Sequence, residues 1–504
     1  MRRPPWKTRA VIFISIATVS IPQVSGAIGK GTIERVDTYL TANVPQGLSA
    51  SISIAKNGEM LLSKGYGFAD RAQRVVNAPD TVFDIGSLTK QFTAAAILRL
   101  AEQKKLTLTD SLGKYFVNVP QDKQNITLHQ LLTHSAGFPE YPANDFDAVT
   151  VEQYLGHVFS SKLEFAPGEK YSYSNVGYAL LGFVIERVAG VSYEQYLSDS
   201  FFRPLKMQQT GWVLPKWDQA KIAHGYAFDC FDRGTSIERY QEIGVSPVLM
   251  GNGGINSTLV DLHRWLASLH DATILSPASV RTLFSPHIRL PDRRRTDRSD
   301  ESYAYGWMVA KFARGAKAIF HSGDNGNFRA TILLLPEDKV EIIYLSNNGD
   351  RSSFAVPFEV KNMLFDEKYS PRPVVPSPYR VVDEFVLEHP SSASDQLLNH
   401  YSARMGSGIA EKSLLNRLGL FYAREGKKNV QWGIELLKLN VQLFPDDGNL
   451  RDSLGEGYLI GDQPELAIES FRKALAIAPS PECRWCDNSR KKLRELDADL
   501  STIQ

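Results

Sequence analysis

The sequence predicts an α+β fold, in which one antiparallel sheet is covered by helices, followed by a small all-α region. Three observations lead to this prediction. Strand patterns stand near both ends of the first 370 residues, helical patterns fill the stretch between them, and only helical patterns follow residue 394. The chain has 504 residues, of which 43% are hydrophobic, so we expect more than one folded unit and a substantial core.

The predicted sheet begins with a hairpin. Residues 49–56 alternate in polarity, Asn57-Gly58 is a strong two-residue turn, and residues 59–66 supply the second strand. Strand patterns return at residues 316–320, 329–335 and 340–346. The last two are separated by only four residues, which favours antiparallel pairing. Strands from both ends of this region therefore complete one sheet.

The first helix after the hairpin carries the most informative motif, Ser87-Leu-Thr-Lys90. Gly86 permits a tight entry turn, and residues 91–100 are good helix formers with apolar residues at helical spacing. If Ser87 opens this helix, Lys90 lies on the same face one turn along and can reach the serine hydroxyl. A serine needs such a base because its hydroxyl is a poor nucleophile at neutral pH.

The Ser-x-x-Lys pattern alone carries little weight, because it starts at five serines: Ser53, Ser87, Ser111, Ser470 and Ser489. Ser53 lies in a predicted strand, where residues three apart face opposite sides of the sheet. Ser470 and Ser489 lie in charged helical segments that read as solvated faces. Ser111 reads as a cap or turn residue. The Ser87 copy is therefore the candidate.

Two further motifs follow in order, and each occurs once: Tyr173-Ser-Asn175 and His321-Ser-Gly323. In isolation Tyr173 reads as a half-buried aromatic residue and His321 as an ordinary residue at a strand end. Together with Ser87 and Lys90 they can build a serine acyl-transfer site.

The chain resembles the penicillin-binding-protein and class C β-lactamase-like serine hydrolases, the β-lactamase-related or serine peptidase S12 family. The resemblance spans roughly residues 33–365. Its motifs are FDIGSLTKQFT at 83–93, LLTHSAG at 131–137, PG at 167–168 ahead of YSYSN at 171–175, and GNGGINST at 251–258. It implies the β-lactamase/transpeptidase-like fold, an antiparallel sheet flanked by helices.

The resemblance also implies roles for the motif residues. Ser87 is the expected nucleophile, and Lys90 and Tyr173 are jointly expected to take and pass on its proton. No metal or organic cofactor is expected, because these three groups suffice for acylation and deacylation. The expected pocket walls are residues 139–146, 228–248 and 291–305.

Four further residues are expected to bind substrate. Asn175 would contact it directly, and His321-Ser-Gly323 takes the place that Lys-Thr-Gly usually holds on the strand beside the site. The resemblance makes the backbone N–H groups of Ser87 and Asp324 the oxyanion donors. His134, in a separate motif, is expected to be structural.

The histidine at position 321 is a departure that bears on the substrate. Lysine would offer a permanent positive charge to a substrate carboxylate, whereas histidine is mostly neutral at pH 7. We therefore expect cleavage of an ester or amide, of the esterase or D-amino-acid peptidase type. The alternatives are a β-lactamase or D,D-carboxypeptidase, and a non-catalytic binding module with an interacting tail.

The net charge and residues 1–27 indicate the binding partners and the cellular location of the protein. The net charge is +1 with dispersed basic residues, so no nucleic-acid partner is expected, and the substrate is a small molecule or peptide. Residues 1–27 read as a signal peptide, with basic residues before an apolar run and the small residues Ser25-Gly-Ala27 at its end. We expect a periplasmic or secreted protein, membrane-anchored if this segment stays uncleaved.

The C-terminal part begins with a Pro-rich stretch at residues 371–394, expected to be a stiff extended linker. In the following region, residues 395–496, Phe444-Pro445 and Ala478-Pro479 recur 34 residues apart, which resembles tetratricopeptide repeats. Two repeats need a capping helix or the body for support. The tail is expected to give structural support or, alternatively, to bind a protein partner. Cys483 and Cys486 form a local disulfide or are incidental.

Overall fold

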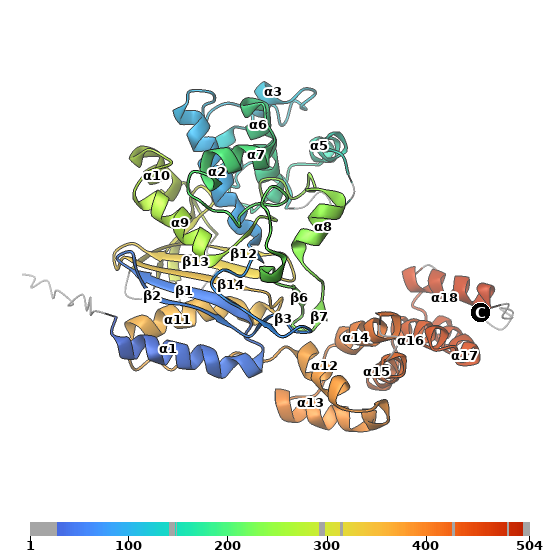
Figure 1. Ribbon diagram of the computed structural model, residues 1–504. Helices are drawn as coiled ribbons and strands as arrows, with labels where there is room; N and C mark the ends of the chain where they lie inside the picture. The colour runs from blue at the N-terminus through green and yellow to red at the C-terminus, as the bar shows by residue number, and fades with distance from the viewer. Residues whose placement is uncertain are drawn as a thin grey trace, which may run out of the picture.

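The computed structural model describes residues 28–496 except 141–146, 148, 292–297, 313–315, 426–428 and 481–482. The predicted signal peptide lies outside the described residues. Within them, mixed helix and antiparallel sheet form a body, and a run of helices follows it (Figure 1). The predicted α+β class is confirmed.

Eight antiparallel strands form the central sheet in the order β2-β1-β14-β13-β12-β11-β10-β9. They are β1 (Ala50–Lys56), β2 (Glu59–Tyr66), β9 (Ile288–Arg289), β10 (Arg298–Tyr303), β11 (Met308–Phe312), β12 (Lys317–Asp324), β13 (Arg329–Leu335) and β14 (Val340–Ser346). The N-terminal hairpin joins the sheet through β1, where Ala50 lies opposite Ser346 and Lys56 opposite Val340. Strands from both ends of the body thus share one sheet, as predicted.

Strand β12 is longer than its sequence pattern indicated. It continues past Phe320 to Asp324, because His321, Ser322 and Gly323 pair with Ile332, Thr331 and Ala330 of β13. The His-x-Gly motif therefore lies within a paired strand and inside the sheet.

Helices cover both faces of the sheet (Figure 1). One face packs on α1 (Lys30–Asn43) and α11 (Val356–Phe365) through a cluster that includes Ile52 and Ile342. The neighbouring residue Ile343 points to the other cluster, as expected for alternating strand side chains. That larger layer contains α2 (Thr89–Glu102), α3 (Leu112–Tyr115), α4 (Leu128–Leu132), α5 (Val151–Ser160), α6 (Asn175–Ala189), α7 (Tyr193–Leu197), α8 (Ser236–Ile243), α9 (Leu259–His270) and α10 (Pro277–Phe284).

Among the described residues, three small two-stranded sheets accompany the main one. They pair β3 (Phe68–Asp70) with β4 (Val75–Val76), β5 (Phe83–Asp84) with β8 (Asn256–Ser257), and β6 (Tyr226–Ala227) with β7 (Phe231–Asp232). The short single turns are η1 (Val44–Gln46), η2 (Gly86–Leu88), η3 (Ser198–Phe202), η4 (Gln219–Lys221), η6 (Arg351–Ala355) and η7 (Ser391–Gln396). The β5–β8 pair fixes the chain immediately before η2, which contains Ser87.

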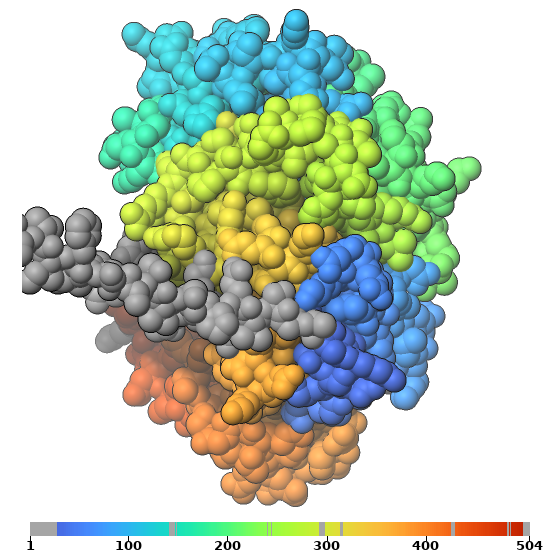
Figure 2. Space-filling model, turned by 90° about the vertical axis from the view of Figure 1, so that its left-hand side faces the viewer, coloured from blue at the N-terminus to red at the C-terminus, as the bar shows by residue number. Residues whose placement is uncertain are grey.

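The C-terminal region is helical throughout its described elements. It contains α12 (Pro378–Glu388), α13 (Leu397–Met405), α14 (Lys412–Glu425), α15 (Val430–Leu443), α16 (Gly448–Ile460), α17 (Pro464–Ala476) and α18 (Arg484–Glu495). Helix α14 packs on α15 and α16 packs on α17, so each sequence repeat corresponds to one helical hairpin. In the space-filling view, orange C-terminal helices lie below the dark blue start of the body (Figure 2).

The predicted extended linker over residues 371–394 is wrong in its central part. Pro378 begins helix α12, with Ser377 as its N-cap, and the helix continues to Glu388. Proline is favoured in the first helical turn because the N–H that it lacks has no helical partner there. The apolar side chains of α12, including Val382 and Phe385, then bury against the following helices.

The structure decides between the two alternatives for the cysteine pair. Cys483 and Cys486 form a disulfide, and Cys230 is free. No single described helix has both the length and the apolar composition to cross a membrane; the bent pair Asn175–Ala189 and Tyr193–Phe202 meets these criteria only when its two members are taken together.

Candidate active site

Ser87 lies in η2, one short turn ahead of α2, and is half-buried between the buried residues Gly86 and Leu88. Lys90 follows in the first turn of α2, and its Nζ lies 3.0 Å from Ser87 Oγ. The sequence predicted that Ser87 opens the helix. The structure places it in a 3₁₀ turn that runs into the helix, which keeps the expected spacing.

The Lys90 side chain is fully buried, and its amine lies within hydrogen-bond distance of oxygens from three residues. Besides Ser87 Oγ, its Nζ lies 2.7 Å from Asn175 Oδ1 and 2.8 Å from the Asn252 carbonyl oxygen. Asn175 begins α6, and Asn252 lies in the Gly-rich segment before β8. Three segments far apart in the sequence therefore converge on one amine.

Tyr173 lies on the extended segment before α6 and is half-buried. The centroid of its ring is 4.8 Å from Lys90 Nζ and 6.4 Å from the ring of His321. His134 packs beneath it with ring centroids 4.3 Å apart, and its Nδ1 accepts a hydrogen bond of 3.1 Å from the Ser174 N–H. Burial, followed by the charge of Lys90, lowers the pKa of His134 well below its usual value. The neutral His134 thus holds the Tyr173 segment, which agrees with its predicted structural role.

The turn before Ser87 and the end of β12 approach one another at two glycines. Gly86 has a φ of +51°, and a Cβ on it would lie 2.7 Å from the Asp324 nitrogen. A Cβ on Gly323 would lie 2.0 Å from the Ile85 carbonyl oxygen and 3.1 Å from the Ser87 nitrogen. The two backbones approach so closely that neither glycine can carry a side chain. The backbone amides of Ser87 and Asp324 lie on the two sides of this close approach, which we call the glycine seam.

His321 lies on β12 with its ring buried at 4% exposure. Its Nδ1 is 2.8 Å from the Ser322 carbonyl oxygen and its Nε2 is 3.1 Å from the Tyr303 hydroxyl. A carbonyl oxygen only accepts, so Nδ1 carries the proton and Nε2 accepts from Tyr303; the tautomer is assigned from this network. Burial, followed by the charge of Lys90, lowers the pKa of His321 to about 3. The ring is therefore neutral at pH 7, and both of its nitrogens have partners within the protein.

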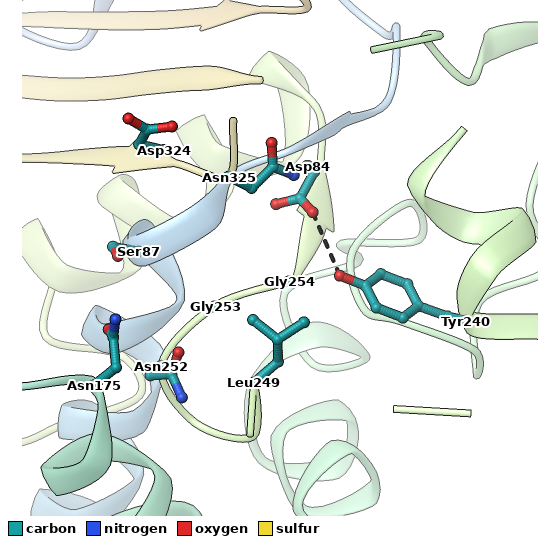
Figure 3. Close-up of a pocket in the computed structure, with 10 residues that line it drawn as sticks. All are labelled: Asp84, Ser87, Asn175, Tyr240, Leu249, Asn252, Gly253, Gly254, Asp324 and Asn325. Atoms are coloured by element: carbon teal, nitrogen blue, oxygen red, sulfur yellow. Dashed lines mark hydrogen bonds between the residues drawn. The ribbon is translucent and has the colours of Figure 1, made fainter. Parts of the chain in front are cut away.

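A pocket opens in front of Ser87 (Figure 3). Its lining residues are Asp84, Ser87, Asn175, Tyr240, Leu249, Asn252, Gly253, Gly254, Asp324 and Asn325. Tyr240 donates a hydrogen bond of 3.4 Å to Asp84 Oδ2, and Asp84 Oδ1 accepts one of 2.7 Å from the Gly86 N–H. Asp324 pairs with Arg329, and its side chain is 39% exposed. Two carboxylates thus line the pocket beside Ser87.

The structure brings all seven sequence-predicted site residues to this region. Ser87, Lys90 and Asn175 are linked by hydrogen bonds, Tyr173 lies over Lys90, and His321, Gly323 and Asp324 lie on β12 beside Ser87. Of the ten lining residues the sequence singled out Ser87, Asn175 and Asp324; those it missed include Asp84, Tyr240 and Asn252. Tyr240 lies within the predicted wall 228–248, whereas the walls at 139–146 and 291–305 lie partly outside the described residues.

The described part of the chain offers no metal site: it contains no group of three His, Cys, Asp or Glu side chains placed to hold an ion.

A second pocket lies on the C-terminal helices, away from Ser87. It is lined by Asn416, Leu420, Arg424, Asn449, Asp452, Ser453, Glu456, Trp485 and Asn488. The prediction of a protein partner at these helices stays a prediction.

Comparison with known proteins places the body in a family. Residues 40–358 match the family model described as Beta-lactamase. Protein flp of Staphylococcus aureus strain MW2 is 30% identical over 325 residues, which cover 62% of this chain and 63% of that protein. Penicillin-binding protein 4* of Bacillus subtilis strain 168 is 26% identical over 338 residues, or 64% of this chain and 73% of that protein.

A solved structure gives the same result. The octameric penicillin-binding protein homologue from Pyrococcus abyssi superimposes with a TM-score of 0.58 at 27% identity, covering 70% of this chain and 81% of that one. Since the family model matches more than half of the chain, around the site described above, the protein belongs to the Beta-lactamase family, whose members are normally serine hydrolases.

Proposed function

We propose that this protein is a serine hydrolase that cleaves an ester or amide through an acyl-enzyme on Ser87. The observation that carries the proposal is the environment of Lys90. Its Nζ lies within hydrogen-bond distance of Ser87 Oγ and of two oxygens, Asn175 Oδ1 and the Asn252 carbonyl, that can only accept.

This geometry gives the neutral amine of Lys90 one favourable orientation. A neutral amine has two N–H bonds and one lone pair. The two acceptor oxygens, on Asn175 and Asn252, each take an N–H, so the lone pair is directed at the Ser87 hydroxyl. In that state Lys90 accepts the hydroxyl proton, and in the ammonium state it donates to all three oxygens. The site is thus organised for proton transfer to and from Ser87.

The reaction that follows has two halves. Ser87 Oγ attacks the substrate carbonyl carbon while Lys90 and Tyr173 jointly take its proton, and the amides of Ser87 and Asp324 donate to the resulting oxyanion. The bond to the leaving group breaks, and the leaving group receives that proton from Tyr173. Water then attacks the acyl-Ser87 ester by the reverse proton route, releasing the acid and the free serine.

The surroundings of the pocket favour an acyl donor that needs no carboxylate. The neutral His321 ring has both nitrogens engaged within the protein, so it offers no positive charge and no free N–H to an anion. The residues that line the pocket with Asp84 include no cation, and the charge of Asp324 is compensated by Arg329, so the lining offers no net positive charge to a substrate carboxylate. Neutral esters and amides that carry an amino group, such as D-amino-acid amides, fit these charges best.

The second candidate is a β-lactamase or D,D-carboxypeptidase, and it is supported by the relatives named as penicillin-binding proteins. The chain spans 63% of the length of Protein flp, so the activity of the whole relative is not transferred. A matched panel separates the candidates: p-nitrophenyl esters that are neutral or carry a terminal carboxylate, a D-alanine p-nitroanilide, and penicillin G, each with Ser87→Ala as control.

We expect Ser87-dependent hydrolysis of the neutral ester or the amino-bearing amide at a higher kcat/KM than that of the carboxylate ester or penicillin. Preference for penicillin would move the function to the second candidate. Absence of any Ser87-dependent hydrolysis or labelling would favour a non-catalytic binding module.

We also propose export to the periplasm or medium, on the basis of the basic and apolar segments in residues 1–27.

A further inference from the structure

The β6–β7 hairpin is the point where the C-terminal helices meet the body. Ala227 and Phe231 of this hairpin share one buried apolar cluster with side chains of α12, α14 and α15. The ring of Phe231 lies 4.5 Å from that of Phe421 in α14. Figure 1 shows the hairpin between the sheet and the C-terminal helices. Part of the body therefore folds into the core of the tail.

A buried ion cluster fixes the tip of this hairpin from both sides. The side chain of Asp229 is 1% exposed and accepts hydrogen bonds from Arg71 of the body and from Arg380 of α12. The Arg380 contact is 3.2 Å long. Next to it, the ring of Phe228 stacks on Tyr379 of α12 with centroids 4.5 Å apart. Tyr379 and Arg380, neighbours in α12, thus contact Phe228 and Asp229, neighbours in the turn.

The turn that they hold is strained. Phe228 and Asp229 both have left-handed backbone angles, with φ of +53° and +67°. The Cys230 N–H donates to the Ala227 carbonyl over 3.2 Å and closes the turn around them. Turns of this kind favour Asn-Gly, and a bulky residue at positive φ persists only where its surroundings hold it. From the tail, Tyr379 and Arg380 of α12 contact the two strained residues, and the guanidinium of Arg417 in α14 lies over the Phe228 ring at 5.0 Å.

The hairpin leads directly into a wall of the pocket. Gly225 N–H donates to the Gly234 carbonyl over 3.0 Å, and Thr235 then caps α8. Helix α8 carries Tyr240, which is 1% exposed and donates to Asp84 beside the nucleophile turn (Figure 3). A short stretch of chain therefore joins the tail contacts to the pocket.

We propose that Tyr379 and Arg380 are positioning residues of the acyl pocket. By holding the strained hairpin they set α8, and through α8 they set the Tyr240–Asp84 wall beside Ser87. The tail thus contributes to substrate binding without touching the substrate. The kinetic part of this inference rests on the proposed function, whereas its structural part does not.

The structural part is tested by hydrogen exchange on the full chain. The variant Arg380→Gln removes the charge that Asp229 receives from α12, and Arg424→Gln is the matched control, because Arg424 pairs with Glu456 within the tail. We expect amides of residues 226–243 to exchange about tenfold faster in Arg380→Gln. Exchange in β13 and β14 should stay as in the wild type. Unchanged exchange in α8 overturns the proposal.

The kinetic part uses the ester that the wild type hydrolyses best. We expect Arg380→Gln to raise KM about threefold to tenfold with kcat within about twofold, since the Tyr240–Asp84 wall contributes binding and the acyl-transfer groups are untouched. Adding Phe228→Gly should restore KM, because glycine adopts the left-handed turn without strain and reduces its need for the tail. A loss of kcat alone, or no recovery, contradicts the proposal.

The hydrogen-exchange and kinetic experiments together distinguish a failure of this inference from a failure of the proposed function. If the wild type hydrolyses no ester or amide, the proposed function fails, and the exchange of α8 still decides whether the tail holds the pocket wall. Tyr379→Leu gives a second variant that keeps both the buried charges and an apolar side chain. It should shift α8 exchange in the same direction as Arg380→Gln.

Discussion

The Tyr303 hydroxyl donates to Nε2 of His321 over 3.1 Å, and it occupies the ring nitrogen that is not bound to the Ser322 carbonyl. The ring at position 321, where the family resemblance led us to compare histidine with lysine, is therefore a buried neutral group. Under the proposed function, the acyl-transfer groups around Ser87 therefore receive no positive charge from position 321 for binding a substrate carboxylate.

The first prediction concerns His321→Lys. A lysine ammonium at this position restores a positive charge beside the pocket, and a charge-assisted hydrogen bond typically contributes about 1.5–3 kcal/mol. We expect KM for a carboxylate-bearing ester to fall by about tenfold or more, with little change for the neutral ester. His321→Gln is the control for loss of the ring. Equal KM values for the carboxylate-bearing ester in the lysine and glutamine variants would show that the positive charge at position 321 does not cause the tighter binding.

The second prediction follows from the pKa of His321, which is about 3 in the folded protein. In the unfolded chain the pKa of this histidine is roughly 6.5, so between about pH 3 and 6.5 the unfolded state binds more protons than the folded state. The free energy of unfolding therefore rises with pH over this interval, and the contribution of His321 levels off above it. Between pH 6.5 and 5 the wild type should lose about 1.6 kcal/mol more than His321→Gln. Urea unfolding at both pH values measures this. Parallel losses in the two proteins would contradict a buried neutral ring.

The third prediction concerns Lys90→Arg. Arginine keeps the positive charge but does not deprotonate in proteins, so it cannot accept the Ser87 proton. We expect kcat to fall by about a hundredfold to ten-thousandfold, the usual contribution of a positioned acid or base. Steady-state kinetics measures it, with circular dichroism as a check on folding. Activity within tenfold of the wild type would show that Tyr173 acts alone.

The fourth prediction concerns the glycine seam. In Gly323→Ala the new Cβ would lie 2.0 Å from the Ile85 carbonyl oxygen, so the strand end and the Ser87 turn must move apart. We expect kcat to fall about a hundredfold to a thousandfold, as when an oxyanion donor is lost. Gly156→Ala is the matched control, because a Cβ there meets nothing within 4 Å. Similar kcat values in both variants would exclude these amides as oxyanion donors.

Local sequence rules predicted the parts of the site that depend on local spacing. Ser87 and Lys90 share a helix face, and the hairpin before them follows from Asn57-Gly58, so both could be derived from neighbouring residues. Asn252 could not be foreseen as a partner of Lys90, because it acts through a backbone carbonyl that any residue would supply. Tyr240 reaches Asp84 across 156 residues, a contact set by tertiary packing alone.

The linker shows a different limit of sequence reasoning. Four prolines between positions 371 and 378 indicated an extended stretch, but Pro378 is the first residue of α12. The amphipathic pattern after it decided the outcome, because Val382 and Phe385 bury against the tail. Proline density was wrong about the conformation of this stretch, and the boundary placed at residue 371 stays a prediction.

The most direct test of the account is trapping of the acyl-enzyme. The full chain is mixed with the ester it hydrolyses best, quenched in acid within the first turnovers, and measured by intact mass and peptide mapping. We predict a mass increase equal to the acyl group on the peptide that contains Ser87, absent in Ser87→Ala. Hydrolysis without any acyl group on Ser87, or an equal adduct in Ser87→Ala, would contradict the account.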